Sequence, residues 1–266
     1  MMRIFLNEMK QNRKNLFLWA LCVGGLCLGC ILLYTSLEDS LKDIADSYSN
    51  MGAMSVAFGM DKISIATLTG FFATEIALMH GLGGAMFAAL IGSSMISKEE
   101  AGHTSEFLNT LPVGRESVLI QKYLAMVMNI LLFHGICFLA YLIGFLVMGE
   151  EIAVKEMLLL FVAQFLLFLE IGTISFLISS CAKKNLIGAG LGMTILFYAF
   201  DVMCRIIPVL KNGKYVTPFY YANAPDIFTD GHIVWNIAGV GIGVTVIWFV
   251  LSLVWYRLKD LSSLMI

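Results

Sequence analysis

The residues that could do chemistry in this sequence are a few charged side chains set inside long apolar runs. Glu75, Glu170, Asp201 and Arg205 each interrupt such a run. If the runs cross a lipid bilayer, an ionised group within them is costly unless it finds a partner, so each is a candidate functional residue. Asp201 and Arg205 are four positions apart on one helix face, which favours mutual neutralisation; lining a transport path is the alternative.

Glu170 is the most isolated of these charges, because it lies near the middle of its apolar run. Two interpretations are open: it faces a lumen and binds a substrate cation or a proton, or a neighbouring helix hydrogen-bonds its carboxyl group and its role is structural. Glu75 precedes His80 by five positions. This spacing turns the two side chains about 140° apart around a helix, so they do not form a metal-binding pair.

Motifs for catalysis or metal binding are lacking elsewhere. The H-E-x-x-H pattern of a zinc hydrolase is absent, and His134 and His232 have no ligand-like neighbours in the sequence. Cys27 and Cys30 form a C-x-x-C inside an apolar run without a second ligand pair, so we expect small core residues rather than a metal or redox site. We predict no catalytic residue, no metal site and no cofactor in this chain.

The composition decides the class of protein. Of the 266 residues, 59% are hydrophobic and 14% are charged, whereas a soluble domain is roughly 45–50% apolar and about 25% charged. The net charge of −2 gives no support for a nucleic-acid partner. We therefore predict an all-α, polytopic integral membrane protein with one transmembrane domain and six spans.

The six expected spans correspond to the six hydrophobic runs, at about 16–34, 68–96, 118–148, 157–181, 186–210 and 233–255. Before the first run, residues 1–15 place Ile4, Phe5 and Met9 opposite Arg3 and Lys10. That pattern predicts an amphipathic helix lying in the headgroup plane, with a polar tail as the alternative.

Small residues recur at four-residue spacing in two of the spans. Gly84, Ala88 and Gly92 do so in the second span, and Gly188 and Gly192 in the fifth. Such spacing lets helix backbones approach closely. We expect these two spans to contact a second copy of the chain and to line a lumen between the copies.

Residues 97–117 form a polar interval with a helix-forming pattern between the second and third spans. Glu99 and Glu100 lie in the first turn of a predicted helix, where acidic side chains favour the helix dipole. Phe107 and Leu108 give its far end an apolar surface. The segment is suited to docking on another protein; a solvated connector is the alternative.

A second polar segment, before the last span, is rich in aromatic residues. Phe219, Tyr220 and Tyr221 follow one another there. Aromatic side chains at the headgroup level usually anchor a chain at the membrane interface. The alternative is an external gate that closes an exit path.

The strings that carry a family resemblance occur in three places. IGSSMISKEEAGHTSEFLNTLPVGRESVLIQKYL contains an acidic pair, an interrupted glycine–threonine pair, an E-x-L-like turn, L-P-x-x-R and a lysine that opens the next span. TPFYYANAPDIFTDG is like an S-P-F-x-Y-F external segment, with Thr217 in place of serine, and WYRLKDL is like a basic Y-x-R-x-D-L tail. Together they resemble the type-2 (ABC-2) exporter permeases; His103, between Gly102 and Thr104, departs from the pattern.

The resemblance implies a permease without its own motor. The sequence agrees, because it contains no G-x-x-x-x-G-K-[ST] for ATP phosphates. The resemblance further implies a separate ATPase subunit that binds ATP and Mg, and a second permease copy or a paralogue. It also implies that the protein resides in the cell membrane. Residues 97–117 would then be the coupling helix, and the residues at the ATPase joint would be Glu99, Glu100, Glu106, Phe107, Leu108 and Arg115.

An amphipathic substrate suits an apolar lumen, so the expected cargo is an antimicrobial peptide, an antibiotic or a lipid. A proton-coupled secondary transporter that uses Glu170 is the alternative function. An intramembrane enzyme would need convergent catalytic groups, which the sequence does not show.

The distribution of Lys and Arg predicts the orientation, because most of the 17 fall on the side that contains both termini and residues 97–117. A cysteine introduced between Ser97 and Arg115 should therefore react with a membrane-impermeant reagent only from the cytoplasmic side. A cysteine at Lys211 is the matched control and should react only from outside. Labelling of Ser97–Arg115 in intact cells would overturn this topology.

Overall fold

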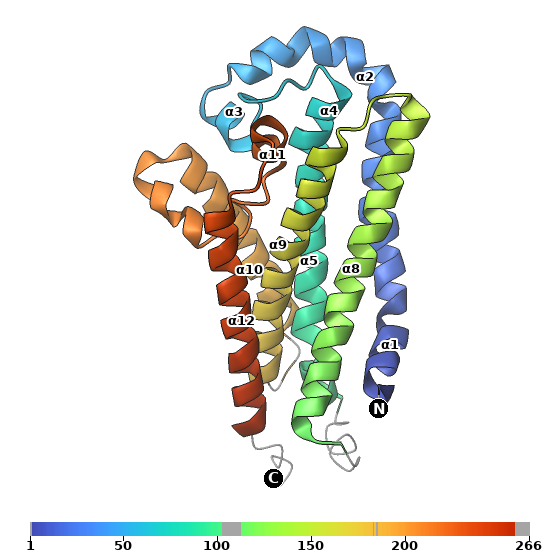
Figure 1. Ribbon diagram of the computed structural model, residues 1–266, viewed down its shortest axis with the longest axis vertical. Helices are drawn as coiled ribbons and strands as arrows, with labels where there is room; N and C mark the ends of the chain where they lie inside the picture. Colours follow the sequence, from blue (N-terminus) through green and yellow to red (C-terminus); the bar gives the residue numbers. More distant parts are fainter. Residues whose placement is uncertain (1, 103–112, 183, 185, 259–266) are drawn as a thin grey trace.

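The structure, a computed structural model, describes residues 2–102, 113–182, 184 and 186–258 (Figure 1). Its described part is built from helices, six of which are long and apolar enough to cross a membrane. The all-α, multi-pass expectation is therefore confirmed. The first and last long helices have their outer ends at the same end of the bundle, as an even number of crossings requires (Figure 1).

The first span is much longer than expected. Helix α1 (Arg3–Trp19) continues through the π-helical turn η1 (Ala20–Gly24) into α2 (Gly25–Ser49). The residues at both junctions have right-handed helical dihedral angles, so the chain has no break there. The helix expected over residues 1–15 is present from Arg3 on, but it is not a separate element, because it is the first part of the 47-residue helix Arg3–Ser49. Its position in the headgroup plane stays a prediction.

The other five spans agree with the sequence to within a few residues, except at one end. They are α4–η2–α5 (Leu68–Phe71, Phe72–Ile76, Ala77–Ser94), α8 (Arg115–Met148), α9 (Val154–Cys181), α10 (Ile187–Ile206) and α12 (Trp235–Leu258). The fifth span stops before the expected residue 210, because Pro208 cannot continue an α-helix and starts the 3₁₀ helix η3 (Pro208–Tyr215).

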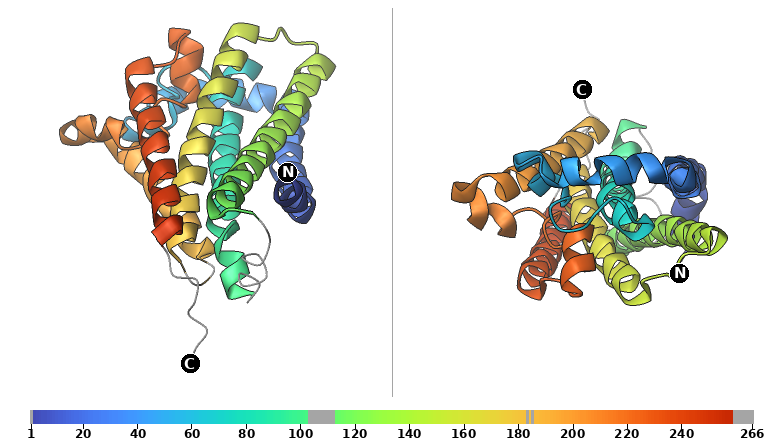
Figure 2. Two further views of the ribbon diagram at one scale, coloured as in Figure 1. Left: turned by 60° about the horizontal axis from the view of Figure 1, so that its bottom comes forward. Right: turned by 90° about the horizontal axis from the view of Figure 1, so that it is seen from above.

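Short helices cover the end of the bundle remote from the start of α1. They are α3 (Ala53–Phe58), η3 and α11 (Ala224–Asp230), and the last turns of α2 run across the same end (Figure 2). Ala45 of α2 packs there with Met60 and Ile65 in a small apolar cluster. At the opposite end the described part of the polar interval contains α6 (Ser97–Ala101).

Helix α5 lies at the centre of the bundle, where its glycines allow close contact with α9. A Cβ atom at Gly84 would lie 2.2 Å from the ring of Phe168, and one at Gly92 would lie 2.4 Å from the carbonyl oxygen of Gly172. The small-residue face of the second span is therefore used inside the chain, against α9, and is not open to a second copy. Contact of this span with a second copy through another face stays a prediction. Gly188 and Gly192 of α10 face open space, so the expectation for the fifth span stays a prediction.

The close contact at Gly92 predicts that adding one methyl group at this position lowers the stability of the protein markedly. Gly92→Ala should lower the free energy of unfolding by about 1–3 kcal/mol, because the backbone oxygen it meets cannot move aside. Thermal unfolding in detergent measures this. Gly29→Ala on α2 is the control, since nothing lies within 4 Å of its built Cβ. Equal melting temperatures for the two variants would contradict the packing of α5 on α9.

Candidate functional site

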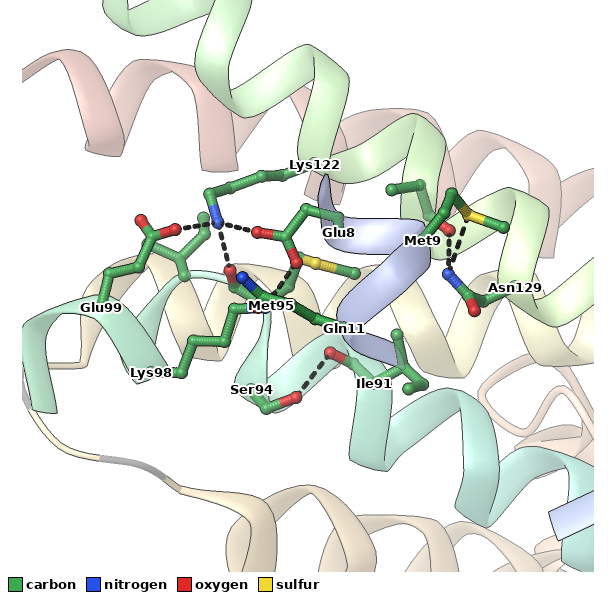
Figure 3. Close-up of polar contacts among 12 residues, drawn as sticks. Glu8, Met9, Gln11, Ile91, Ser94, Met95, Lys98, Glu99, Lys122 and Asn129 are labelled. Carbon is green, nitrogen blue, oxygen red and sulfur yellow. Dashed lines mark hydrogen bonds and ion pairs between the residues drawn. The ribbon is translucent and has the colours of Figure 1, made fainter. Parts of the chain in front are cut away.

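A cluster of ion pairs joins three helices at the end of the bundle where the chain begins. The Lys122 side chain of α8 is 1% exposed, and its Nζ atom lies 2.6 Å from Oε1 of Glu8 and 2.5 Å from Oε1 of Glu99. It also donates to the carbonyl oxygen of Met95 at 3.0 Å (Figure 3). A buried ammonium group is thus surrounded by oxygen atoms from α1, α6 and the end of α5.

The cluster extends along α1 through a second lysine. Lys98 of α6 pairs with the other carboxylate oxygen of Glu8. Its Nζ atom also donates to Oε1 of Gln11 at 2.9 Å. Two carboxylates and two ammonium groups therefore balance, which is what a low-dielectric site requires. We call Glu8, Lys98, Glu99 and Lys122 the coupling cluster.

The sequence of α1 places Glu8 toward α8. Glu8, Asn12 and Leu16 recur every four residues and are the buried residues of this helix. The apolar residues Ile4 and Met9 flank them and are half-buried. The amphipathic pattern of the first residues therefore marks the correct face, but that face packs on α8 and has a carboxylate at its centre.

Helix α6 is also held by α9. The Oγ atom of Ser179 accepts hydrogen bonds from the backbone amides of Ile96 at 3.0 Å and Ser97 at 2.9 Å. These amides lie at the start of α6, where a helix leaves its N–H groups without backbone partners. Together with the coupling cluster, Ser179 fastens the segment that leads into residues 103–112 to α1, α8 and α9.

The residues expected at an ATPase joint are in different settings. Glu99 is engaged with Lys122; burial raises the pKa of Glu99 above its usual value, and the Lys122 ammonium opposes that shift. Glu100 is half-buried. Arg115 is exposed at the start of α8. Its Nη1 atom donates to the carbonyl oxygen of Arg257 of α12 at 3.5 Å. Glu106, Phe107 and Leu108 lie outside the described residues.

A second charged cluster lies at the opposite end of the bundle. Arg205 of α10 donates from Nε to Asp201 at 2.8 Å, from Nη1 to Asp226 of α11 at 2.9 Å, and from Nη2 to the carbonyl oxygen of Tyr220 at 3.1 Å. Lys62 pairs with the other oxygen of Asp226 at 2.6 Å. The predicted Asp201–Arg205 pairing is confirmed, and the structure adds two partners that are remote in sequence.

The aromatic residues of the segment before the last span are folded into the chain. Phe219 is 8% and Tyr221 is 3% exposed. The Tyr221 hydroxyl donates to Oε2 of Glu170 at 3.1 Å, and Tyr220 lies beneath the Arg205 guanidinium, whose central carbon is 4.5 Å from the ring centroid. The interpretation of Phe219 and Tyr221 as interfacial anchors is therefore wrong, because both are packed inside the protein.

The core contains a hydrogen-bonded chain that sequence reasoning missed. Nε2 of His134 donates to the carbonyl oxygen of Phe161 at 2.9 Å, so its Nδ1 must accept from Nε2 of His80 at 2.8 Å. Nδ1 of His80 then accepts from the Tyr141 hydroxyl at 2.9 Å. Every group in this chain can be neutral. His80 and His134 are 54 positions apart, and no sequence pattern relates them.

Metal binding finds no support in the described part of the chain. No group of three or more His, Cys, Asp or Glu side chains there is placed to hold a metal ion. Glu75 lies in the π-helical turn η2, half-buried. The cysteines of the described residues are free thiols.

Removing the Lys122 charge should destabilise the protein. Lys122→Met removes the buried ammonium group that contacts both the Glu8 and the Glu99 carboxylate, so we expect a loss of about 3–5 kcal/mol in the free energy of unfolding. Thermal unfolding in detergent checks this, and adding Glu8→Gln and Glu99→Gln should restore much of the loss. The control is Lys42→Met, which breaks the exposed pair with Glu38 and should leave the melting temperature almost unchanged, because water screens an exposed pair. A similar loss in both variants would refute the coupling cluster.

Comparison with known proteins gives a family match. The model of a family described as "ABC-2 family transporter protein" matches residues 2–261. No curated protein matches the chain. The family match includes every helix that the structure describes.

Proposed function

The chain belongs to the ABC-2 transporter family and is the permease of an ABC transporter, and we propose that it exports an amphipathic substrate, driven by a separate ATPase subunit. The cargo class is an antimicrobial peptide, an antibiotic or a lipid. The ATPase subunit binds ATP and Mg and docks at residues 97–117, on the cytoplasmic side of the cell membrane. The permease pairs with a second copy or with a paralogue.

The observation that carries this proposal is the fastening of α6. A force applied to a loosely attached connector would bend the connector alone. Here Lys98 and Glu99 of α6 are ion-paired to α1 and α8, and Ser179 of α9 holds its first amides. A push on the adjoining segment is therefore transmitted to three membrane helices together.

The long first helix gives this movement a route across the membrane. Glu8 lies near one end of the continuous helix Arg3–Ser49, and Ala45 packs in the apolar cluster at the other end. At 1.5 Å per residue its contour is about 70 Å. The π-helical turn Ala20–Gly24 is the place where it can flex, since such turns interrupt regular helix bonding.

The exit of the export path is assigned to the opposite end of the bundle. The cluster of Lys62, Asp201, Arg205 and Asp226 ties α10 to the segment with Phe219, Tyr220 and Tyr221. We propose that this segment is the external gate. Movement of α10 would shift this segment with the helix, because Arg205 of α10 contacts both Asp201 of its own helix and the carbonyl oxygen of Tyr220.

The main test is copurification of the full-length chain from its native membrane. We expect a subunit with a P-loop to accompany it, and Phe107→Asp to abolish both that association and ATP-dependent transport. Val209→Asp is the control, since Val209 is 90% exposed in η3, at the other end of the bundle. If no ATPase copurifies and Phe107→Asp leaves transport intact, the proposal fails.

The alternative, a proton-coupled secondary transporter that uses Glu170, predicts the opposite energetics. Transport in sealed vesicles would then persist without ATP, collapse with a protonophore and be lost in Glu170→Gln. The exporter proposal predicts that transport requires ATP and survives the protonophore.

A further inference from the structure

A cavity lies between α9, α10 and α12, beneath the end of η3. Its volume is about 240 Å³. Ile174 of α9 and Val244 of α12 provide apolar walls, and Phe197, Tyr215 and Trp248 provide aromatic ones. The Glu170 carboxylate is the acidic group of its lining. The cavity thus combines a single negative group with three aromatic rings.

The carboxylate of Glu170 is held in place from two sides. The buried Tyr221 hydroxyl donates to Oε2 at 3.1 Å. On the other side the α12 backbone comes so close that a Cβ atom at Gly241 would lie 2.5 Å from the same oxygen. A hydrogen bond and a glycine contact therefore fix Oε2, whereas the cavity gives the carboxylate a face open to a ligand.

Glu170 differs from Asp201 and Glu8 in its charge balance, whereas Glu75, like Glu170, is in none of the ion pairs of the described residues. Asp201 has Arg205, and Glu8 has Lys98 and Lys122. None of the ion pairs found among the described residues includes Glu170. At membrane depth an ionised carboxylate requires a positive partner. A positively charged molecule bound in the cavity could therefore be the partner of the Glu170 carboxylate.

The aromatic walls indicate what kind of cation fits. The faces of tryptophan, tyrosine and phenylalanine attract organic cations, with tryptophan the strongest. A hydrated metal ion gains little from such walls, whereas an ammonium group on an apolar body gains from both the rings and the aliphatic side chains. Leu196 of α10 and Ile247 of α12 are exposed apolar residues on two of the helices that line the cavity, so these helices present an apolar surface to the bilayer.

We infer that this cavity binds a lipophilic monovalent organic cation, with Glu170 as its counter-ion and Trp248, Tyr215 and Phe197 around its positive group. The inference rests on the proposed function in one respect: it narrows the amphipathic export cargo to molecules with a cationic group. Binding itself requires neither ATP nor a second subunit.

The test measures equilibrium binding of phenyltrimethylammonium to the purified full-length chain in detergent. Saturation-transfer NMR detects the bound cation. Its uncharged isostere, tert-butylbenzene, has the same shape without the charge. We expect saturable binding of the cation, at least ten-fold tighter than that of the isostere. Glu170→Gln should weaken cation binding at least ten-fold, and Trp248→Leu several-fold. Glu156→Gln, at the start of the same helix, is the control and should change it less than two-fold.

Val244→Trp keeps the inference testable if Glu170→Gln does not fold. It fills the cavity while Glu170 and Tyr221 remain, and cation binding should be lost. Equal affinity for the cation and its isostere, or unchanged binding in Glu170→Gln, would overturn the inference. Because no nucleotide or ATPase is present, failure here would leave ATP-driven export standing, and an absent ATPase in copurification would leave cation binding standing.

Discussion

The buried ammonium group of Lys122 is the interaction on which one whole end of this protein depends. A charge at 1% exposure is tolerated only when oxygen atoms surround it, and here those atoms come from Glu8, Glu99 and Met95, in separate segments of the chain. Satisfying one cation therefore requires α1, α6 and the end of α5 to meet at α8. The same requirement makes the region before residues 103–112 a rigid attachment point.

The far end of the bundle follows the same principle with a different cation. Arg205 reaches two carboxylates and a backbone carbonyl at once, because a planar guanidinium has several donors in fixed directions. Between these charged clusters the interior is mainly apolar, and its polar groups include a hydrogen-bonded chain through His80 and His134 that can be neutral. Charged joints at both ends and a close-packed core between them suit helices that move as units. Glu170 stands apart from both clusters, and its surroundings are those of a binding site.

Helix packing decides which surfaces remain for other molecules. The glycine face of α5 is consumed by α9, where Gly92 meets a backbone oxygen, so the central helix has no small-residue face left for a partner. In the most apolar 18-residue stretch of α10, and likewise of α12, only 22% of the residues are buried. Their outer faces, including the open positions at Gly188 and Gly192, are available to lipid or to a second permease.

The sequence by itself determined the class of protein, the number of spans and the Asp201–Arg205 pair, because hydropathy and spacing along one helix are local properties. Its glycine pattern also showed that close helix contacts exist. Only the tertiary structure decided which helix meets Gly92, that Glu8 pairs with Lys122 across 114 positions, and that Tyr221 reaches Glu170. These contacts join side chains on different helices, and a helical repeat indicates which face is buried but not what covers it. The tertiary structure also decided that α1 continues into α2. The polar and apolar residues near Arg3 have the pattern of an interfacial helix, and the sequence does not show that α8 covers the buried face of this helix.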